Sequence, residues 1–97
     1  MRFDTGVATV TTAGTQVQLY NVTSRVKYIK VKALAGNSGL VYVGPADVSS
    51  STGYELSAGN EMELNYGEFG GSVSASVFWA DAATNGDKVC WAMILEG

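Results

Sequence analysis

The stretch "RVKYIKVKALAGNSGLVYVG", residues 25–44, decides the fold of this chain. In its first half, apolar side chains alternate with polar ones such as Lys30 and Lys32, which is the period of a β-strand with one buried face. The central AGNSG then predicts a turn, because Gly and Asn tolerate positive φ angles. We therefore predict a β-hairpin that pairs residues 26–34 with residues 40–44.

The chain leaves this predicted hairpin at its only proline, Pro45. Proline cannot donate a hydrogen bond to a sheet, so we expect the strand to end there. The polar segment 45–53 is expected to close one end of the domain without performing chemistry, since Asp47 and its serines can bond local backbone. The GEFGG segment at 67–71 is expected to be a flexible break.

Similar alternation predicts further short strands on both sides of this stretch. They cover residues 6–12, 16–21, 61–66, 72–79 and 88–95. The strand over 72–79 would point Val73, Ala75, Val77 and Trp79 inward. The strand over 88–95 is apolar on both faces, so it is central in its sheet or has one face against a partner. No segment has the period of a helix.

About seven or eight short strands with regular turns predict an all-β fold. We expect a single-domain antiparallel β-sandwich or jelly-roll-like barrel over residues 1–97, with residues 1–5 as a mobile N-terminal arm. The longest apolar runs are shorter than the roughly 18 residues that span a membrane, and the N-terminus has no signal-peptide pattern. We therefore expect no membrane association.

The composition argues against several kinds of active site. The chain has one cysteine and no histidine, which removes internal disulfides, the commonest general base and the usual nitrogen ligand of zinc. Its net charge of −3 argues against nucleic-acid binding. Residues 1–48 carry five basic and two acidic side chains, a net charge of +3, whereas residues 49–97 carry one basic and seven acidic, a net charge of −6. Copies of the chain could therefore meet head to tail, or one end could face a charged partner; the alternative is that this asymmetry is chance.

Three motifs suggest chemistry but have simpler structural explanations. Residues 81–87, DAATNGD, resemble half of a calcium loop but lack its third ligand and its final glutamate, so we expect a turn at Asn85-Gly86. Glu61 and Glu63 share one strand face, which we expect to be solvated rather than a paired-carboxylate site. Cys90 lies among apolar residues and is expected to be a buried, inert thiol.

Aromatic residues also have two interpretations. Trp79 and Trp91 could form a platform that stacks on sugars, but both fall in phase with aliphatic residues, so we expect them to pack in the core. The basic and aromatic residues of SRVKYIKVK could contact single-stranded nucleic acid. The acidic chain favours instead a solvated face or a contact to an acidic protein partner.

The run 26–64, "VKYIKVKALAGNSGLVYVGPADVSSSTGYELSAGNEMEL", resembles small β-sandwich structural proteins of tailed bacteriophages. The similarity lies in the VYVG unit, a small polar loop with Val-Ser, and Gly-x-x-Leu-x-x-Gly before an acidic, apolar strand. These elements are Val41-Tyr42-Val43-Gly44, Val48-Ser49, and Gly53, Leu56 and Gly59 followed by Glu61.

This resemblance implies a non-enzymatic virion structural protein without a cofactor or metal. A single domain of this size suits a head decoration, or cement, protein, made in the host cytoplasm and bound to the outer surface of the assembled shell of the major capsid protein. Such proteins are often homotrimers, and we expect a trimer or another small cyclic homo-oligomer. The alternative is a phage tail, fibre or adhesin β-domain, including one that binds carbohydrate. The candidate capsid contacts are Arg2 and Phe3 of the arm, and Lys30 and Lys32.

Overall fold

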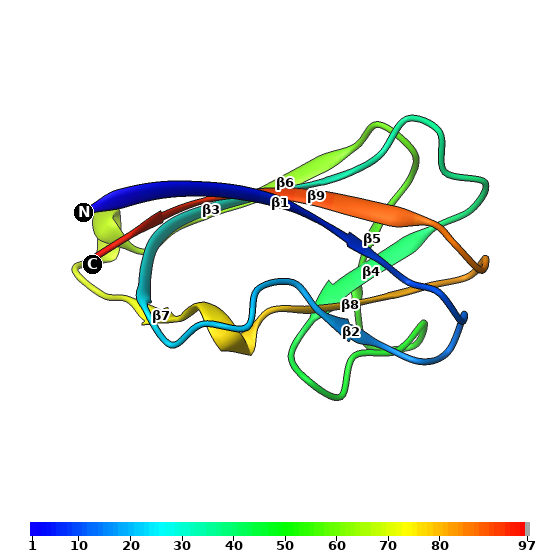
Figure 1. Ribbon diagram of the computed structural model, residues 1–97, viewed down its shortest axis with the longest axis horizontal. Helices are drawn as coiled ribbons and strands as arrows, with labels where there is room; N and C mark the ends of the chain where they lie inside the picture. Colours follow the sequence, from blue (N-terminus) through cyan, green and yellow to red (C-terminus); the bar gives the residue numbers. More distant parts are fainter. Residues whose placement is uncertain (97) are drawn as a thin grey trace.

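The computed structural model describes residues 1–96, which form two antiparallel β-sheets packed face to face (Figure 1). The first sheet has the order β1 (Arg2–Thr9), β9 (Lys88–Leu95), β3 (Arg25–Ala33) and β6 (Glu61–Asn65), and β7 (Val73–Ser74) pairs with the start of β3. The second sheet has the order β2 (Val17–Gln18), β8 (Trp79–Ala82), β4 (Val41–Gly44) and β5 (Tyr54–Leu56). The predicted all-β sandwich is confirmed.

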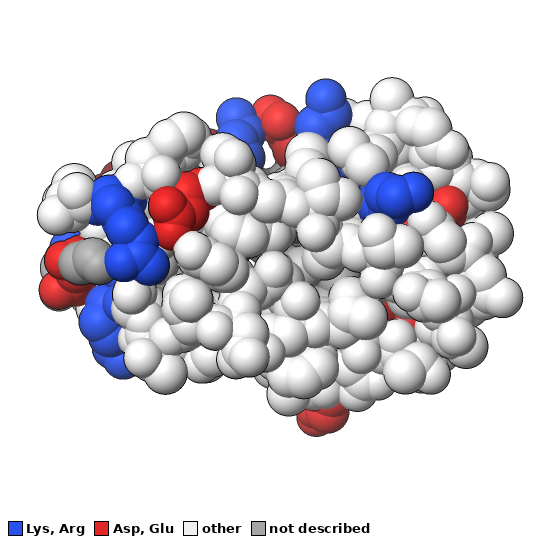
Figure 2. Space-filling view, viewed as in Figure 1, with Lys and Arg blue, Asp and Glu red and all other residues white. Residues whose placement is uncertain are grey.

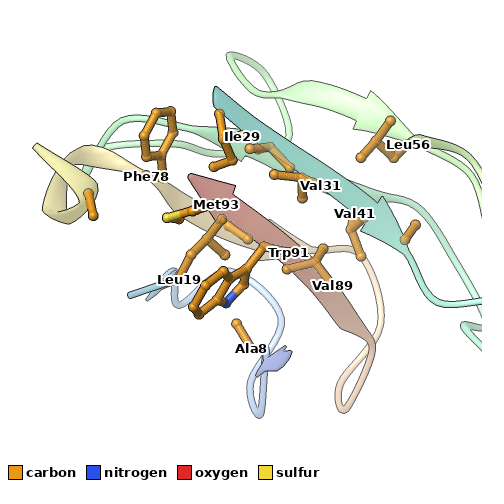
Figure 3. Packing of buried hydrophobic residues seen from close by; sticks show 14 of the residues in the cluster. Ala8, Leu19, Ile29, Val31, Val41, Leu56, Phe78, Val89, Trp91 and Met93 are labelled. Carbon is orange, nitrogen blue, oxygen red and sulfur yellow. The ribbon is translucent and has the colours of Figure 1, made fainter. Parts of the chain in front are cut away.

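The core lies between the two sheets and follows the alternation of the long strands. Inward side chains of β3 and β9, including Ile29, Val31, Trp91 and Met93, are almost fully buried and belong to one apolar cluster (Figure 3). Strand β9 has β1 on one side and β3 on the other. Strand β9 is therefore central in its sheet, which is one of the two alternatives that its two-faced apolar sequence predicts.

The predicted hairpin of residues 26–34 with residues 40–44 is wrong. Strand β3 pairs with β9 and with β6, so neither of its edges is left for β4, and the intervening turn carries the chain to the second sheet. The crossing is fixed by a distant residue, because the Asp87 carboxylate accepts hydrogen bonds of 2.9 Å from the backbone N–H groups of Ser38 and Gly39.

The predicted mobile arm over residues 1–5 is also wrong, since β1 begins at Arg2. Its register places Phe3 opposite Ile94 and Thr5 opposite Ala92. The arm forms a strand because β9 offers a long edge that β3 does not cover. The N-terminus therefore supplies one of the two edge strands of the first sheet.

The predicted strand over 72–79 is interrupted by a 3-10 helix, η2 (Ala75–Val77), which shifts the side-chain phase. Its first turn is capped by the Ser74 side chain, which accepts a hydrogen bond from the N–H of Ser76. As a result Phe78 is buried, whereas Val77, expected inside, is 44% exposed. A second 3-10 helix, η1 (Gly67–Phe69), replaces the predicted flexible break. Neither described helix is long enough to cross a membrane.

The loop after Pro45 folds back over the outer face of the second sheet. Val48 is only 2% exposed, and it packs against Gly44 and Gly53. A Cβ on Gly53 would lie 2.5 Å from the Cβ of Tyr42, so only glycine lets the loop approach this closely. The loop therefore covers Tyr42 and adds a small apolar cluster outside the main core.

Candidate functional site

Residues 81–87 hydrogen-bond the turn at residues 13–14 and hold it in place. The Asp81 carboxylate accepts a 2.9 Å hydrogen bond from the N–H of Gly14, and the Asn85 side chain accepts a 2.7 Å bond from the N–H of Ala13. Gly86 has a φ of +85°, which confirms the predicted turn. In the described part of the chain no three His, Cys, Asp or Glu side chains cluster closely enough to hold a metal ion.

The two tryptophans do not form a joint platform. Trp91 is 6% exposed and stacks against Tyr20 with a ring-centroid distance of 4.5 Å, so its predicted place in the core is confirmed. Trp79 is half-buried, and its indole N–H donates to the carbonyl of Ser76 at 3.2 Å. A sugar-stacking surface would therefore have only part of Trp79 available.

The outer face of the first sheet brings together most of the predicted contact residues. Its antiparallel register aligns side chains into three rows across β1, β9, β3 and β6. The rows are Phe3–Ile94–Tyr28–Asn65, Thr5–Ala92–Lys30–Glu63 and Val7–Cys90–Lys32–Glu61. Phe3, Lys30 and Lys32 thus share one face although β9 separates the strand of Phe3 from the strand of the two lysines.

Arg2 is not part of this face. Its register partner is the buried Leu95, and its guanidinium hydrogen-bonds the Asp4 carboxylate at 3.0 Å. Asp4 also accepts a 2.6 Å bond from the hydroxyl of Tyr20. These two bonds, first that from Tyr20 and then that from Arg2, hold the pKa of Asp4 below its usual value. The group fastens β1 to the segment around Tyr20.

The middle of the outer face is hollow. A trough of about 430 Å³ runs over β9, where the outward side chains Cys90 and Ala92 are small. Taller neighbours flank it, Val7 on β1 and the two lysines on β3. The trough was not predictable from any one segment, since its shape depends on which residues of β1, β9 and β3 lie opposite one another.

The charges around the trough are only partly paired. The Lys30 ammonium lies 3.1 Å from the Glu61 carboxylate, and that contact raises the pKa of Lys30. The Tyr28 hydroxyl donates to Glu63, which raises the pKa of Tyr28. The Lys32 side chain makes neither a hydrogen bond nor an ion pair with any described residue.

The prediction that Cys90 is buried is wrong. Its side chain is half-buried and lines the trough, because even-numbered residues of β9 point away from the core and none of the described residues covers that face completely. The neighbours Val89 and Trp91 point inward and are buried.

Comparison with known proteins supports the fold. No protein-family model matches this chain, and no curated protein sequence matches it. Among solved structures, an RmlC-like cupin protein from Desulfovibrio desulfuricans is similar, with a TM-score of 0.51, 13% identity, and coverage of 94% of this chain and 70% of that protein. IMPa from Pseudomonas aeruginosa, solved with an O-glycopeptide, has the same TM-score and identity over 97% of this chain, which spans 12% of IMPa.

The SPBc2 prophage-derived protein YomS is also a neighbour, with a TM-score of 0.42 and 10% identity over 99% of this chain and 96% of that protein. Identities this low concern architecture alone. The chain thus has a cupin-like β-sandwich fold, and its neighbours include a prophage-derived protein.

Proposed function

We propose that this chain is a non-enzymatic structural protein of a bacteriophage virion, and specifically a capsid decoration protein. It binds the outside of the assembled shell of the major capsid protein and stabilises it. The resemblance of residues 26–64 to small phage structural proteins supports the virion context, and the two-layer sandwich supplies a rigid body.

One observation carries the docking role: the outer face of the first sheet is open and partly apolar. Phe3 is 66% exposed and Val7 is 58% exposed, and both lie on the face that Ile94, Ala92 and Cys90 share. Clustered exposed apolar side chains are typical of protein interaction sites, whereas single ones are ordinary. Burying a phenylalanine side chain contributes roughly 1.5–3 kcal/mol before ordering costs.

The low charge of the molecule fits extensive protein contact. Charged residues make up 15% of the chain, and one side of the molecule shows a broad uncharged area with charged side chains mainly at its margins (Figure 2). A shell repeats the same contact many times, so a modest affinity per copy is sufficient, more so if the chain is the expected trimer.

The test is sedimentation of the purified chain with empty assembled heads of the phage that encodes it, and with unassembled capsid protein. We expect co-sedimentation with heads only. The variant Phe3→Ser/Val7→Ser should lose binding, while Val77→Ser, which removes an apolar side chain exposed elsewhere, should bind normally. All variants should keep the melting temperature of the unmodified chain within a few degrees. If the native chain does not co-sediment with assembled heads, the proposed function is wrong.

A further inference from the structure

We infer that the trough over β9 is a receptor for a segment of the partner protein in which an apolar side chain stands next to a carboxylate. This inference rests on the proposed function and assigns the chemistry of the contact. The apolar side chain would lie over Cys90 and Ala92, and the carboxylate would meet Lys32.

The shape of the trough follows from the register of three strands. Across β1, β9 and β3 the row through Cys90 runs from Val7 to Lys32, and the row through Ala92 runs from Thr5 to Lys30. Small side chains in the centre of each row leave the floor low, while the ends of the rows rise. A hollow of about 430 Å³ has room for a large apolar side chain together with part of the backbone that carries it.

The charged side chains around the trough favour a carboxylate beside the apolar side chain of the ligand. Lys30 and Lys32 line the trough with a single carboxylate, Glu61, and Glu61 is engaged by Lys30. Glu63, the next acid on β6, accepts from the Tyr28 hydroxyl. Lys32 therefore remains as a cation beside an apolar floor, with no partner in the described chain. One free ammonium and an apolar surface complement a carboxylate attached to an apolar group.

The only cysteine of the chain makes the occupancy of the trough measurable. Cys90 is half-buried and lines the floor of the trough, so a small thiol reagent such as iodoacetamide should reach it when the trough is open. Binding to heads should slow the alkylation of Cys90 at least tenfold. Mass spectrometry of this chain measures the rate. The same rate measured at rising protein concentration without heads reports whether a second copy fills the trough.

Two variant pairs test the two halves of the site by binding to assembled heads. Ala92→Leu fills the floor and should weaken binding at least tenfold, whereas Ala92→Ser keeps it open and should bind nearly as well as the native chain. Lys32→Gln should weaken binding about two- to fivefold at low salt, and Lys32→Arg should retain it.

The outcomes separate this inference from the proposed function. If the native chain binds heads but Cys90 stays reactive and Ala92→Leu binds normally, the trough is not the receptor and the decoration role stands. If alkylation slows with protein concentration alone, a second copy occupies the trough and the inferred partner is wrong. If the native chain binds no heads, both ideas fail.

Discussion

Replacing Gly6 by alanine should destabilise the fold through a single contact. Gly6 lies opposite Trp91 in the pairing of β1 with β9, and a Cβ at this position would lie 2.8 Å from Cε2 of the indole and closer still to Cζ2. The indole cannot easily retreat, because it is 6% exposed and stacked against Tyr20. Gly6 lacks a positive φ, so alanine introduces no backbone strain and only the steric clash is tested.

The expected cost follows from known packing energies. Overpacking a core costs about 1–3 kcal/mol, and the lower unfolded-state entropy of alanine offsets about 0.4–1 kcal/mol of it. The net loss of about 1–2 kcal/mol corresponds to a fall in melting temperature of about 4–16 °C for a domain of this size. Differential scanning calorimetry measures this change directly.

Matched controls decide whether the clash is responsible. Gly36→Ala adds the same methyl group where no atom lies within 4 Å and φ is not positive, so its melting temperature should not fall. Trp91→Phe removes the second ring, so the double variant with Gly6→Ala should be less destabilised than the sum of the single changes, with a coupling of about 0.5–3 kcal/mol. A Gly6→Ala protein that melts within 2 °C of the native chain, by this order-of-magnitude argument, would refute the packing account.

Three further predictions test other parts of the fold. The hydroxyl of Tyr20 lowers the pKa of Asp4, so the contribution of Asp4 to stability is complete above the usual value of 3.8 and is lost as the pH falls through the lowered pKa. Asp4→Asn should therefore flatten the drop in melting temperature below about pH 4. Asp87→Ala leaves two backbone N–H groups without their acceptor and should cost about 1–3 kcal/mol in chemical denaturation, and Asp87→Asn should cost less. Val48→Ala should lower the free energy of unfolding by about 1–3 kcal/mol because Val48 is buried. Ser50→Ala, at an exposed position of the same loop, should change the free energy of unfolding by under about 0.5 kcal/mol. Equal effects at both positions would contradict the packing role assigned to the loop.

Strands were predictable from sequence where apolar and polar residues alternate along the chain. The alternation of β3 reports one buried face, and the apolar sequence of β9 agrees with its central position between β1 and β3. The pairing of β3 was not predictable, because the turn at 35–39 shows only that the chain reverses and not which strand receives it. Both edges of β3 are taken by β9 and β6, which lie far along the chain, and Asp87, about fifty residues beyond the turn, holds that turn by accepting from the N–H groups of Ser38 and Gly39.

The candidate site was predictable residue by residue but not as a surface. Alternation alone places Lys30 and Lys32 on one outward face, and Phe3 was identified as a candidate contact residue. The trough requires the register of β1 against β9, which joins the two ends of the chain. The prediction that Val77 points inward was wrong because strict alternation does not allow for a 3-10 turn. The local sign of that turn is Ser74, whose side chain caps it by accepting a hydrogen bond from the N–H of Ser76.

Strand β1 combines stability and docking in one segment, and the alternation of its side chains keeps the two separable. Its even-numbered residues face inward, where Asp4 receives the Tyr20 hydroxyl and Gly6 makes room for Trp91. Its odd-numbered residues, Phe3 and Val7 among them, face outward and are mostly exposed. Substitutions at odd positions should therefore change binding with little change in melting temperature, and substitutions at even positions should lower the melting temperature first. A shift of β1 by one residue against β9 would exchange the two sets, so both properties depend on the same register.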